Sequence, residues 1–146
     1  MKIVFLCVAN SARSQMAEGL ARAMAKPGIE IMSAGSLPSQ VNPFAILVLQ
    51  ELAIDISHHT SKNVSELDLS DVTYVITLCA DEVCPVFIGT AQKLHWPFTD
   101  PAGVGQSDEE KLAAFRAIRN QIQDKLKNWL NENGLLNSDL NHANLR

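Results

Sequence analysis

The chain has 146 residues, of which 47% are hydrophobic and 19% charged, and its formal net charge is −4. This length and composition indicate one globular domain with a real core and argue against disorder. The acidic balance, without a basic stripe and with only 5% aromatic residues, argues against nucleic acid as a partner. No stretch has the length of a membrane span, and the apolar run at the N-terminus is too short for a signal peptide. We therefore expect a cytoplasmic protein that has no membrane partner.

Residues 1–19 combine a strand, a loop and the start of a helix. The run from Lys2 to Val8 is apolar with β-branched members, which is typical of a buried strand. From Ser14 onward, apolar residues recur at helical spacing, namely Ala17, Leu20, Ala21 and Met24. A strand that ends in a tight loop and opens a helix gathers backbone N–H groups and the positive end of the helix dipole around one point. Such a point binds oxyanions.

Cys7 and Arg13 are the candidate catalytic residues of this loop. A cysteine is nucleophilic only as the thiolate, and a helix N-terminus with a nearby arginine favours that form. Arg13 can bind two oxygens of a tetrahedral anion with its planar guanidinium. We expect Ser14 to donate a hydrogen bond to the leaving sulfur, and Asn10 to adopt the left-handed backbone conformation that a tight cradle needs. The alternative is a structural cysteine beside a surface arginine, because a bare Cys-x5-Arg pattern is common by chance.

The rest of the chain alternates between strand and helix signals. Strands are predicted over residues 29–33, 72–79 and 93–98, and the first of them is expected to stop at Ala34-Gly35. Asn42-Pro43 is a typical helix start, and Ser107-Asp-Glu-Glu110 matches a capping box that opens a long helix. The signals over residues 61–69 are mixed between loop and short helix.

This alternation predicts an α/β fold, with a single domain over residues 1–130. Its sheet is expected to be parallel and four-stranded, with helices on both faces and right-handed crossovers. Ligands of such sheets bind at the carboxyl ends of the strands, near the point where the strand order reverses. Cys7, Cys79 and the segment 97–101 all follow predicted strands, so we expect them at one edge. The polar tail over residues 131–146 is predicted to be poorly ordered.

Cys79 and Cys84 follow the third predicted strand, with four residues between them. One interpretation is a pair of thiols that relays electrons by forming a disulfide. Three cysteines in a cytosolic chain favour catalysis, redox chemistry or simple burial over a disulfide framework. A second interpretation places Cys79 in the core and leaves Cys84 incidental. A third is a zinc site that draws on His58, His59 or His95, although no second cysteine pair is present.

Asp100 follows the fourth predicted strand and precedes Pro101. An aspartic acid above an anion site can give a proton to a departing oxygen, provided that it is held protonated at that moment. An Asp-Pro pair that merely forms a turn is the alternative, and by itself the pattern favours it.

The stretch from Cys7 to Gly19, Cys-Val-Ala-Asn-Ser-Ala-Arg-Ser-Gln-Met-Ala-Glu-Gly, resembles the phosphate loop of the low-molecular-weight protein tyrosine phosphatase superfamily. More narrowly, it is similar to that of the thioredoxin-coupled arsenate reductases, and the similarity runs from Lys2 to about Trp129. The resemblance implies a phosphatase-like anion loop after the first strand, in which Arg13 holds the substrate together with the loop residues. These are Val8, Ala9, Asn10, Ser11, Ala12 and Ser14.

The resemblance also implies a reaction, the reduction of arsenate to arsenite by a three-cysteine relay. Cys7 is then the nucleophile, Cys79 and Cys84 are the resolving pair, and Asp100 assists the loss of water. Thioredoxin, or glutaredoxin, is the expected reductant, and no cofactor or resident metal is expected. The resolving pair is more closely spaced here than in the family, which bears on how far the loop must unwind to close the disulfide.

Two other functions remain open at this point. A small phosphomonoesterase needs only Cys7, Arg13 and Asp100 and works through a phosphocysteine intermediate. A non-enzymatic oxyanion sensor needs only the binding loop. Neither function needs the second and third cysteines, which is why the sequence favours arsenate reduction.

The sequence departs from the family at two further positions. In the tyrosine phosphatases the Asp-Pro segment continues with an aromatic residue that stacks on the substrate, whereas Ala102 stands here. Some arsenate reductases bind potassium beside the loop through an Asn, a Glu, a Ser and an Asp. Asn10, Glu18 and Ser33 match the first three, but Lys62 stands where the Asp is expected. The Lys62 ammonium can supply the positive charge of the ion, or it is a surface residue, and we expect no dependence on potassium.

Overall fold

The structure is a computed structural model that describes residues 1–80 and 89–137. Its elements in chain order are β1 (Lys2–Cys7), α1 (Arg13–Met24), β2 (Glu30–Gly35), α2 (Pro43–Gln50), the 3₁₀ turn η1 (Val64–Glu66), β3 (Tyr74–Thr77), β4 (Gln92–His95), the 3₁₀ turn η2 (Pro101–Gly103) and α3 (Asp108–Glu132). Every predicted strand and helix is present within a few residues of its expected place. The ambiguous segment 61–69 contains η1.

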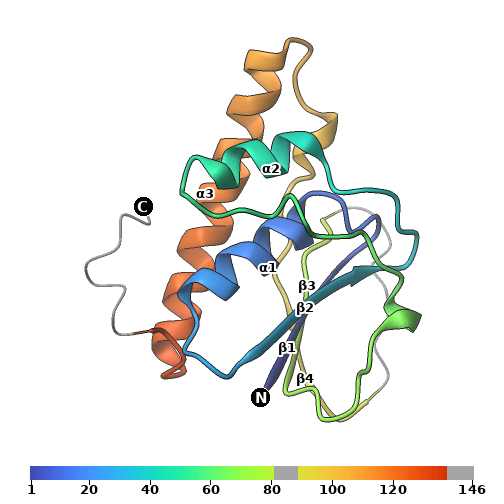
Figure 1. Cartoon of the computed structure of the whole chain (residues 1–146), viewed down its shortest axis with the longest axis vertical. Helices are drawn as coiled ribbons and strands as arrows, with labels where there is room; N and C mark the ends of the chain where they lie inside the picture. Colours follow the sequence, from blue (N-terminus) through green and yellow to red (C-terminus); the bar gives the residue numbers. More distant parts are fainter. Residues whose placement is uncertain (81–88, 138–146) are drawn as a thin grey trace.

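The four strands form one parallel sheet in the order β2-β1-β3-β4 (Figure 1). The predicted parallel, four-stranded sheet is therefore confirmed. The order reverses at β1, because β2 lies on one side of it and the later strands on the other. The register sets Cys7 opposite Gly35 of β2, and Leu6 opposite Thr77 of β3. The loop that follows β1 thus starts at the reversal point, where open α/β sheets bind ligands.

The two faces of the sheet are covered differently. Ile3 and Phe5 of β1 belong to the main core cluster, to which all three α-helices contribute, and the helices contact one another in pairs. Figure 1 shows α1, α2 and α3 grouped beside the sheet. Val4 and Leu6 point to the opposite face, as the two-residue period of a strand requires, and there pack with the segment around η1. In the described part of the chain, the three α-helices thus pack on one face, and of the helices expected on the second face the structure shows only the 3₁₀ turn η1.

α3 begins with the predicted capping box, in which Ser107 and Glu110 bond reciprocally to each other's backbone N–H groups. The helix continues to Glu132, beyond the predicted domain boundary at residue 130. The chain then returns along the end of α1: the N–H of Lys26 donates to the carbonyl of Leu135, at 2.9 Å. Leu135 also packs against the core. Residues 131–137 therefore pack on the domain beyond its predicted boundary. The rest of the tail lies outside the described residues, and its expected disorder stays a prediction.

β2 is longer than predicted, because Ala34 and Gly35 do not stop it but pair with Leu6 and Cys7. A side chain at position 35 has no space: an added Cβ would lie 2.3 Å from the carbonyl oxygen of Val8. Glycine is a weak strand former, but here it permits a close approach of two backbones. The end of β2 is thereby brought against the start of the loop after β1.

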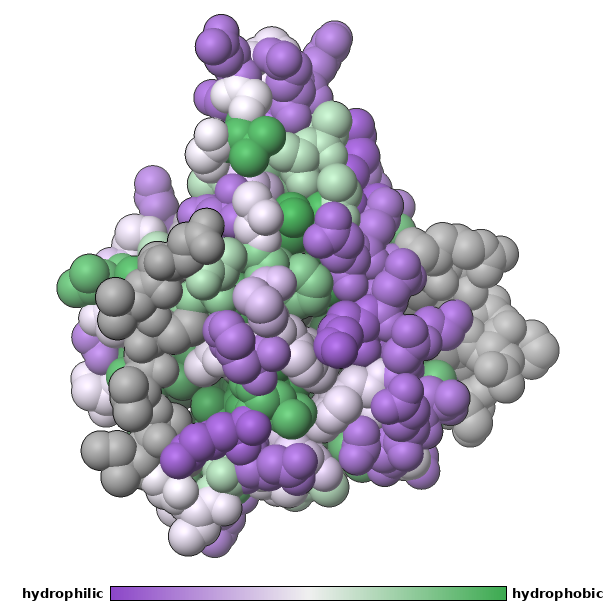
Figure 2. All heavy atoms as spheres, turned by 180° about the vertical axis from the view of Figure 1, so that it is seen from behind, coloured by the Kyte–Doolittle hydropathy of each residue, from purple (hydrophilic) through white to green (hydrophobic). Residues whose placement is uncertain are grey.

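Seen from behind, the molecule exposes hydrophobic side chains in small areas that hydrophilic side chains separate (Figure 2). Among the described residues, no helix combines the length and the apolar character that crossing a membrane requires.

Candidate active site

The loop between β1 and α1 is fixed by its neighbours. Asn10 adopts a positive φ of 48°, the left-handed conformation expected from the sequence. Three carbonyl groups of the loop accept hydrogen bonds from the segment after β2: Val8 from Leu37 N, Ala9 from Ser39 N, and Ser11 from Asn42 N. These hydrogen bonds fix the conformation of the loop backbone between β1 and α1.

Cys7 stands at the end of β1 and is only 2% exposed. It is a free thiol, and its Sγ lies 2.8 Å from the Oγ of Ser14, as the sequence predicts. Asn10 Nδ2 in turn donates to Ser14 Oγ at 2.7 Å. The hydroxyl of Ser14 therefore connects the sulfur to the amide of Asn10, and all three side chains are buried.

A small cavity of about 130 Å³ opens above Cys7. Its lining comes from the loop, the start of α1, and two other segments: Cys7, Ala9, Ser11, Ala12, Arg13, Ser39, Asp100 and Ala102. Ala12 is the N-cap of α1 and makes no capping hydrogen bond with its side chain. The N–H groups of the first turn point out of this helix end, where the dipole is positive. Cavity size, helix end and arginine together suit a tetrahedral oxyanion.

Arg13 joins the loop to the ends of β3 and β4. Arg13 is 4% exposed, and its guanidinium donates to the carbonyl of Phe98 at 2.9 Å and to that of Leu78 at 3.4 Å. Its other terminal nitrogen lies 3.7 Å from Oδ2 of Asp100. The Asp100 side chain is 48% exposed, and its Oδ1 accepts from the N–H of Ala102. A half-exposed carboxyl opposite Cys7 suits proton transfer with an anion in the cavity.

Cys79 is fully buried and takes part in a disulfide whose partner lies outside the described residues. Cys84 also lies outside the described residues. Leu78, the residue before Cys79, donates its N–H to the carbonyl of Leu6 in β1. Cys79 is therefore at the carboxyl edge beside Cys7, as predicted from their positions after strands.

The predicted binding residues fall into two groups, according to whether they line the cavity. Ala9, Ser11 and Ala12 line the cavity, whereas the buried Asn10 and Ser14 act behind it, on the sulfur and on the loop. Val8 contributes a carbonyl to the loop scaffold.

One residue of the cavity lining was not predicted: Ser39, which enters it from the loop after β2. Ala102 of η2, named above only as a departure from the family, also lines the cavity. Ser39 could have been found by the rule that loops after parallel strands meet at one edge. The sequence gives no other signal for it, because serine is common in loops of every kind.

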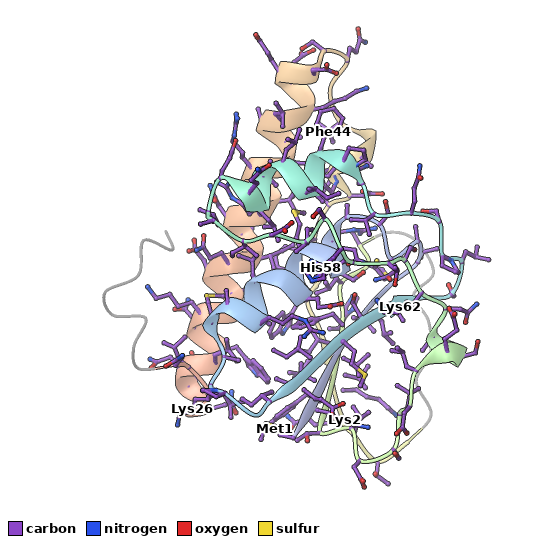
Figure 3. All side chains as sticks on the ribbon, viewed as in Figure 1. Met1, Lys2, Lys26, Phe44, His58 and Lys62 are labelled. Carbon is purple, nitrogen blue, oxygen red and sulfur yellow. The ribbon has the colours of Figure 1, made fainter. Side chains whose placement is uncertain are left out.

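Behind the loop, the buried carboxylate of Glu18 is surrounded by polar partners. Ser33 Oγ donates to it at 2.6 Å, and Arg22 Nε lies 3.1 Å from it. His59 Nε2 lies at 3.7 Å and Lys62 Nζ at 4.0 Å (Lys62 is labelled in Figure 3). Burial lowers the pKa of His59, although Glu18 acts in the opposite direction. With the Lys62 ammonium facing Glu18, the residues present do not fit a potassium site. Independence from potassium stays a prediction.

The histidines considered for zinc have other contacts. His59 Nδ1 lies 3.0 Å from Gln15 Oε1, and His95 Nδ1 lies 2.7 Å from Thr77 Oγ1. Within residues 1–80 and 89–137, no three or more His, Cys, Asp or Glu side chains gather in a way that could hold a metal ion.

Comparison with known proteins decides the family. The model of the low molecular weight phosphotyrosine protein phosphatase family matches residues 2–141. The chain belongs to this family. An arsenate reductase of Halalkalibacterium halodurans is 40% identical over 129 residues, which cover 87% of this chain and 93% of the relative. Members of the family thus include proteins named for a reaction other than dephosphorylation.

Solved structures of similar proteins agree with the fold. The arsenate reductase of Archaeoglobus fulgidus superposes with a TM-score of 0.76 at 28% identity, covering 88% of this chain and 98% of that one. A thioredoxin-dependent arsenate reductase of Corynebacterium glutamicum gives a TM-score of 0.67 at 27% identity, covering 90% of this chain and 60% of that one.

Proposed function

We propose that this protein reduces arsenate to arsenite through a relay of three cysteines. One observation supports this proposal most directly. A free Cys7 lies under an oxyanion-sized cavity, and a disulfide-bonded Cys79 lies close by, at the end of the neighbouring strand. A phosphatase of this family needs the first cysteine but has no use for a redox-active second one. The names of the relatives, at about 40% identity over most of the chain, support the same reaction.

The first step is substitution at arsenic. Arsenate enters the cavity, where Arg13 and the amides at the start of α1 bind its oxygens. The Cys7 thiolate attacks arsenic(V), and one oxygen leaves as water after it accepts a proton from Asp100. No electrons have been transferred to arsenic at this stage, and the product is an adduct with a Cys7 sulfur–arsenic bond.

The second step moves two electrons. The Cys79 thiolate attacks the sulfur of Cys7, a disulfide forms between them, and the electron pair of the sulfur–arsenic bond stays with arsenic. Arsenic(III) then leaves as arsenite. Cys84 next attacks Cys79, so that Cys7 departs as a thiolate and the oxidation rests on a Cys79–Cys84 disulfide. The hydrogen bond between Ser14 and Cys7 stabilises Cys7 when it departs.

The last step returns the enzyme to its dithiol form. Thioredoxin is the proposed reductant, because its low reduction potential suits the reduction of a protein disulfide. The name of the similar Corynebacterium protein, a thioredoxin-dependent arsenate reductase, supports this choice. Glutaredoxin is the alternative reductant, and a cytoplasmic location, where both systems operate, is part of the proposal.

The test is a coupled assay with the full chain, thioredoxin, thioredoxin reductase and NADPH. Addition of arsenate is expected to start NADPH oxidation, with one arsenite formed per NADPH consumed. A parallel assay with glutaredoxin, glutathione and its reductase identifies the reductant. Absence of arsenite in both assays, with the protein folded, would reject the proposal.

A phosphomonoesterase activity is the second candidate. The cavity is lined by Cys7, Arg13 and Asp100, the three residues that such an enzyme needs, and the family model is that of a phosphatase. Against phosphotyrosine as the substrate, the small Ala102 lines the cavity where an aromatic side chain would stack on the ring. Hydrolysis of a small aryl phosphate by a Cys79→Ser variant would measure this activity separately from arsenate reduction.

A further inference from the structure

Behind the Cys7 loop, a chain of hydrogen bonds runs from the sulfur to His59. It passes through four contacts, none longer than 3.0 Å: Cys7 Sγ to Ser14 Oγ, Ser14 Oγ to Asn10 Nδ2, Asn10 Oδ1 to Gln15 Nε2, and Gln15 Oε1 to His59 Nδ1. Gln15 and His59 line no part of the cavity and take no part in the proposed reaction. We propose that the Gln15–His59 pair is a positioning device that fixes the direction of these bonds, so that Ser14 donates its hydrogen to Cys7.

Two backbone carbonyls fix the orientation of the Gln15 amide, and with it the direction of the hydrogen bonds along the chain. Gln15 Nε2 lies 3.0 Å from the carbonyl of Thr60 and 3.2 Å from that of Asn10. A backbone carbonyl can only accept, so the group that faces them is the NH₂ end of the Gln15 amide. Its other end, Oε1, can only accept a hydrogen bond. The nearby Nδ1 of His59 must therefore carry the hydrogen of that contact.

The same logic orients Asn10. Its Oδ1 accepts hydrogen bonds from Gln15 Nε2, at 2.9 Å, and from the backbone N–H of Lys62, at 2.8 Å. Its Nδ2 is therefore turned towards Ser14 Oγ and Ser33 Oγ, which accept. The hydroxyl of Ser33 in turn donates its own hydrogen bond to the carboxylate of Glu18.

Ser14 stands at the end of the chain. Its oxygen accepts from Asn10, so its own hydrogen is free for the one remaining contact, the sulfur of Cys7 at 2.8 Å. A donor aimed at sulfur stabilises the thiolate more than the thiol. The amide of Gln15 is fully buried, so water does not replace its bonds when they are lost. The reactivity of Cys7 thus depends on a residue that touches neither the sulfur nor the substrate.

The surroundings of His59 favour the neutral form of its ring. Its Nε2 faces Glu18, its ring packs edge-on against His58, and Arg22 and Lys62 lie close enough to oppose its protonation. Burial also favours the neutral ring. The neutral ring has one hydrogen, and the Gln15 contact places it on Nδ1.

The proposal rests on the proposed function only in treating Cys7 as the nucleophile, and its test needs no arsenate. The oxidised full-length chain, with Cys79 in its disulfide, is treated with iodoacetamide at pH 7 and pH 10, and modification of Cys7 is followed by peptide mapping. Gln15→Met removes the amide at nearly constant volume. We expect the alkylation rate at pH 7 to fall about tenfold relative to wild type, with a much smaller change at pH 10.

Gln123→Met is the matched control, because Gln123 is equally buried but lies on α3. Its alkylation rates are expected to equal those of wild type at both pH values. Ser14→Ala removes the last donor directly and is expected to reproduce the Gln15→Met pattern. If Gln15→Met and wild type react alike at pH 7 while Ser14→Ala is slow, the chain behind Asn10 does not act on Cys7, and the inference fails.

Two variants of His59 keep the test decisive if Gln15→Met does not fold. The side-chain NH₂ of His59→Asn can replace the donor Nδ1, whereas His59→Leu cannot donate. We expect near-normal alkylation at pH 7 for His59→Asn and a slower rate for His59→Leu. Equal rates for these two variants would contradict the inference. Since arsenate is absent throughout, these results stand whether or not the coupled assay detects arsenite.

Discussion

The two sides of the cavity differ in how they are held. On the β1 side, the side chains of Cys7, Asn10 and Ser14 are at most 2% exposed and are hydrogen-bonded to one another. On the β4 side, the side chain of Asp100 is 48% exposed, and it accepts a hydrogen bond from the backbone N–H of Ala102 in the adjacent turn η2. Arg13 is the link between the sides, with contacts to Phe98 and Asp100.

This difference matches the two tasks of the proposed reaction. Binding a tetrahedral anion and stabilising a thiolate need donors whose positions do not change, because donors fixed in advance cost no reorganisation during the reaction. Delivering a proton needs a group that can exchange protons with solvent. The β1 side meets the first need and the β4 side the second. Each prediction below changes one side of the cavity or the link between the two sides.

The largest effect is expected from the nucleophile. Cys7→Ser is expected to abolish arsenate reduction and any phosphatase activity together, because both start at this sulfur. Cys79→Ser is expected to abolish repeated turnover of arsenate but to leave phosphatase activity, since that activity uses only the anion-binding loop, Arg13 and Asp100. The coupled assay and a small aryl phosphate measure the two reactions. Full arsenate turnover by Cys79→Ser would rule out the relay.

Arg13→Lys tests the link between the two sides. Lysine keeps the charge, but its donors all sit on one nitrogen, so it lacks the planar fork that binds two oxygens of an anion side by side while another nitrogen edge faces the carbonyl of Phe98. We expect kcat/KM for arsenate to fall by at least about tenfold, which corresponds to about 1.4 kcal/mol of transition-state stabilisation. Unchanged kinetics would mean that this guanidinium does not contact the anion.

Gly35→Ala disturbs the β1 side without changing a charged or polar side chain. The new Cβ would meet the Val8 carbonyl at 2.3 Å, so either β2 or the loop must shift. We expect the free energy of unfolding to fall by about 1–3 kcal/mol, the usual cost of overpacking, and KM for arsenate to rise. Gly103→Ala is the control, because nothing lies within 4 Å of its added Cβ. Urea denaturation measures both variants, and equal stabilities would show that the contact at position 35 relaxes freely.

The smallest effect concerns pH. Burial lowers the pKa of His59 below its ordinary 6.5, so the unfolded chain binds this proton more readily than the folded chain. The contribution is therefore fully present above pH 6.5 and is lost as the pH falls from there through the folded-state pKa. We expect wild type to lose more stability between pH 7.5 and pH 5.5 than His59→Asn loses. The carboxyls with lowered pKa values, such as Glu51 beside Arg116, titrate below this range. Equal losses in urea denaturation would contradict this role of His59.

The sequence predicts the β1 side well because its information is local. The spacing from Cys7 to Arg13, the tolerance of Asn10 for positive φ and the hydroxyl of Ser14 all lie within the continuous segment 7–14. Strand periodicity and the rule for parallel sheets then place Cys79 and Asp100 at the same edge. The local and topological signals agree, so the position of the cavity follows from them.

The support of the loop could not be predicted in the same way. Gln15 bonds to Thr60, and Ser33 to Glu18, across 45 and 15 residues, and no spacing rule links such pairs. The extension of β2 to Gly35 was missed because a glycine normally weakens a strand, and its advantage appears only when the Val8 carbonyl is in place. Likewise the polar composition of the tail does not reveal that residues 131–137 pair with the end of α1.

The order of the sulfur steps tests the account most directly. Cys84→Ser blocks the last exchange, so one equivalent of arsenate is expected to release one arsenite per chain and to trap a Cys7–Cys79 disulfide. Peptide mapping of the alkylated, unreduced protein identifies the pair, and Cys79→Ser treated in the same way is expected to trap no disulfide. A Cys7–Cys84 bond in the Cys79→Ser protein, or arsenite release from Cys84→Ser without any intramolecular disulfide, would contradict the proposed relay.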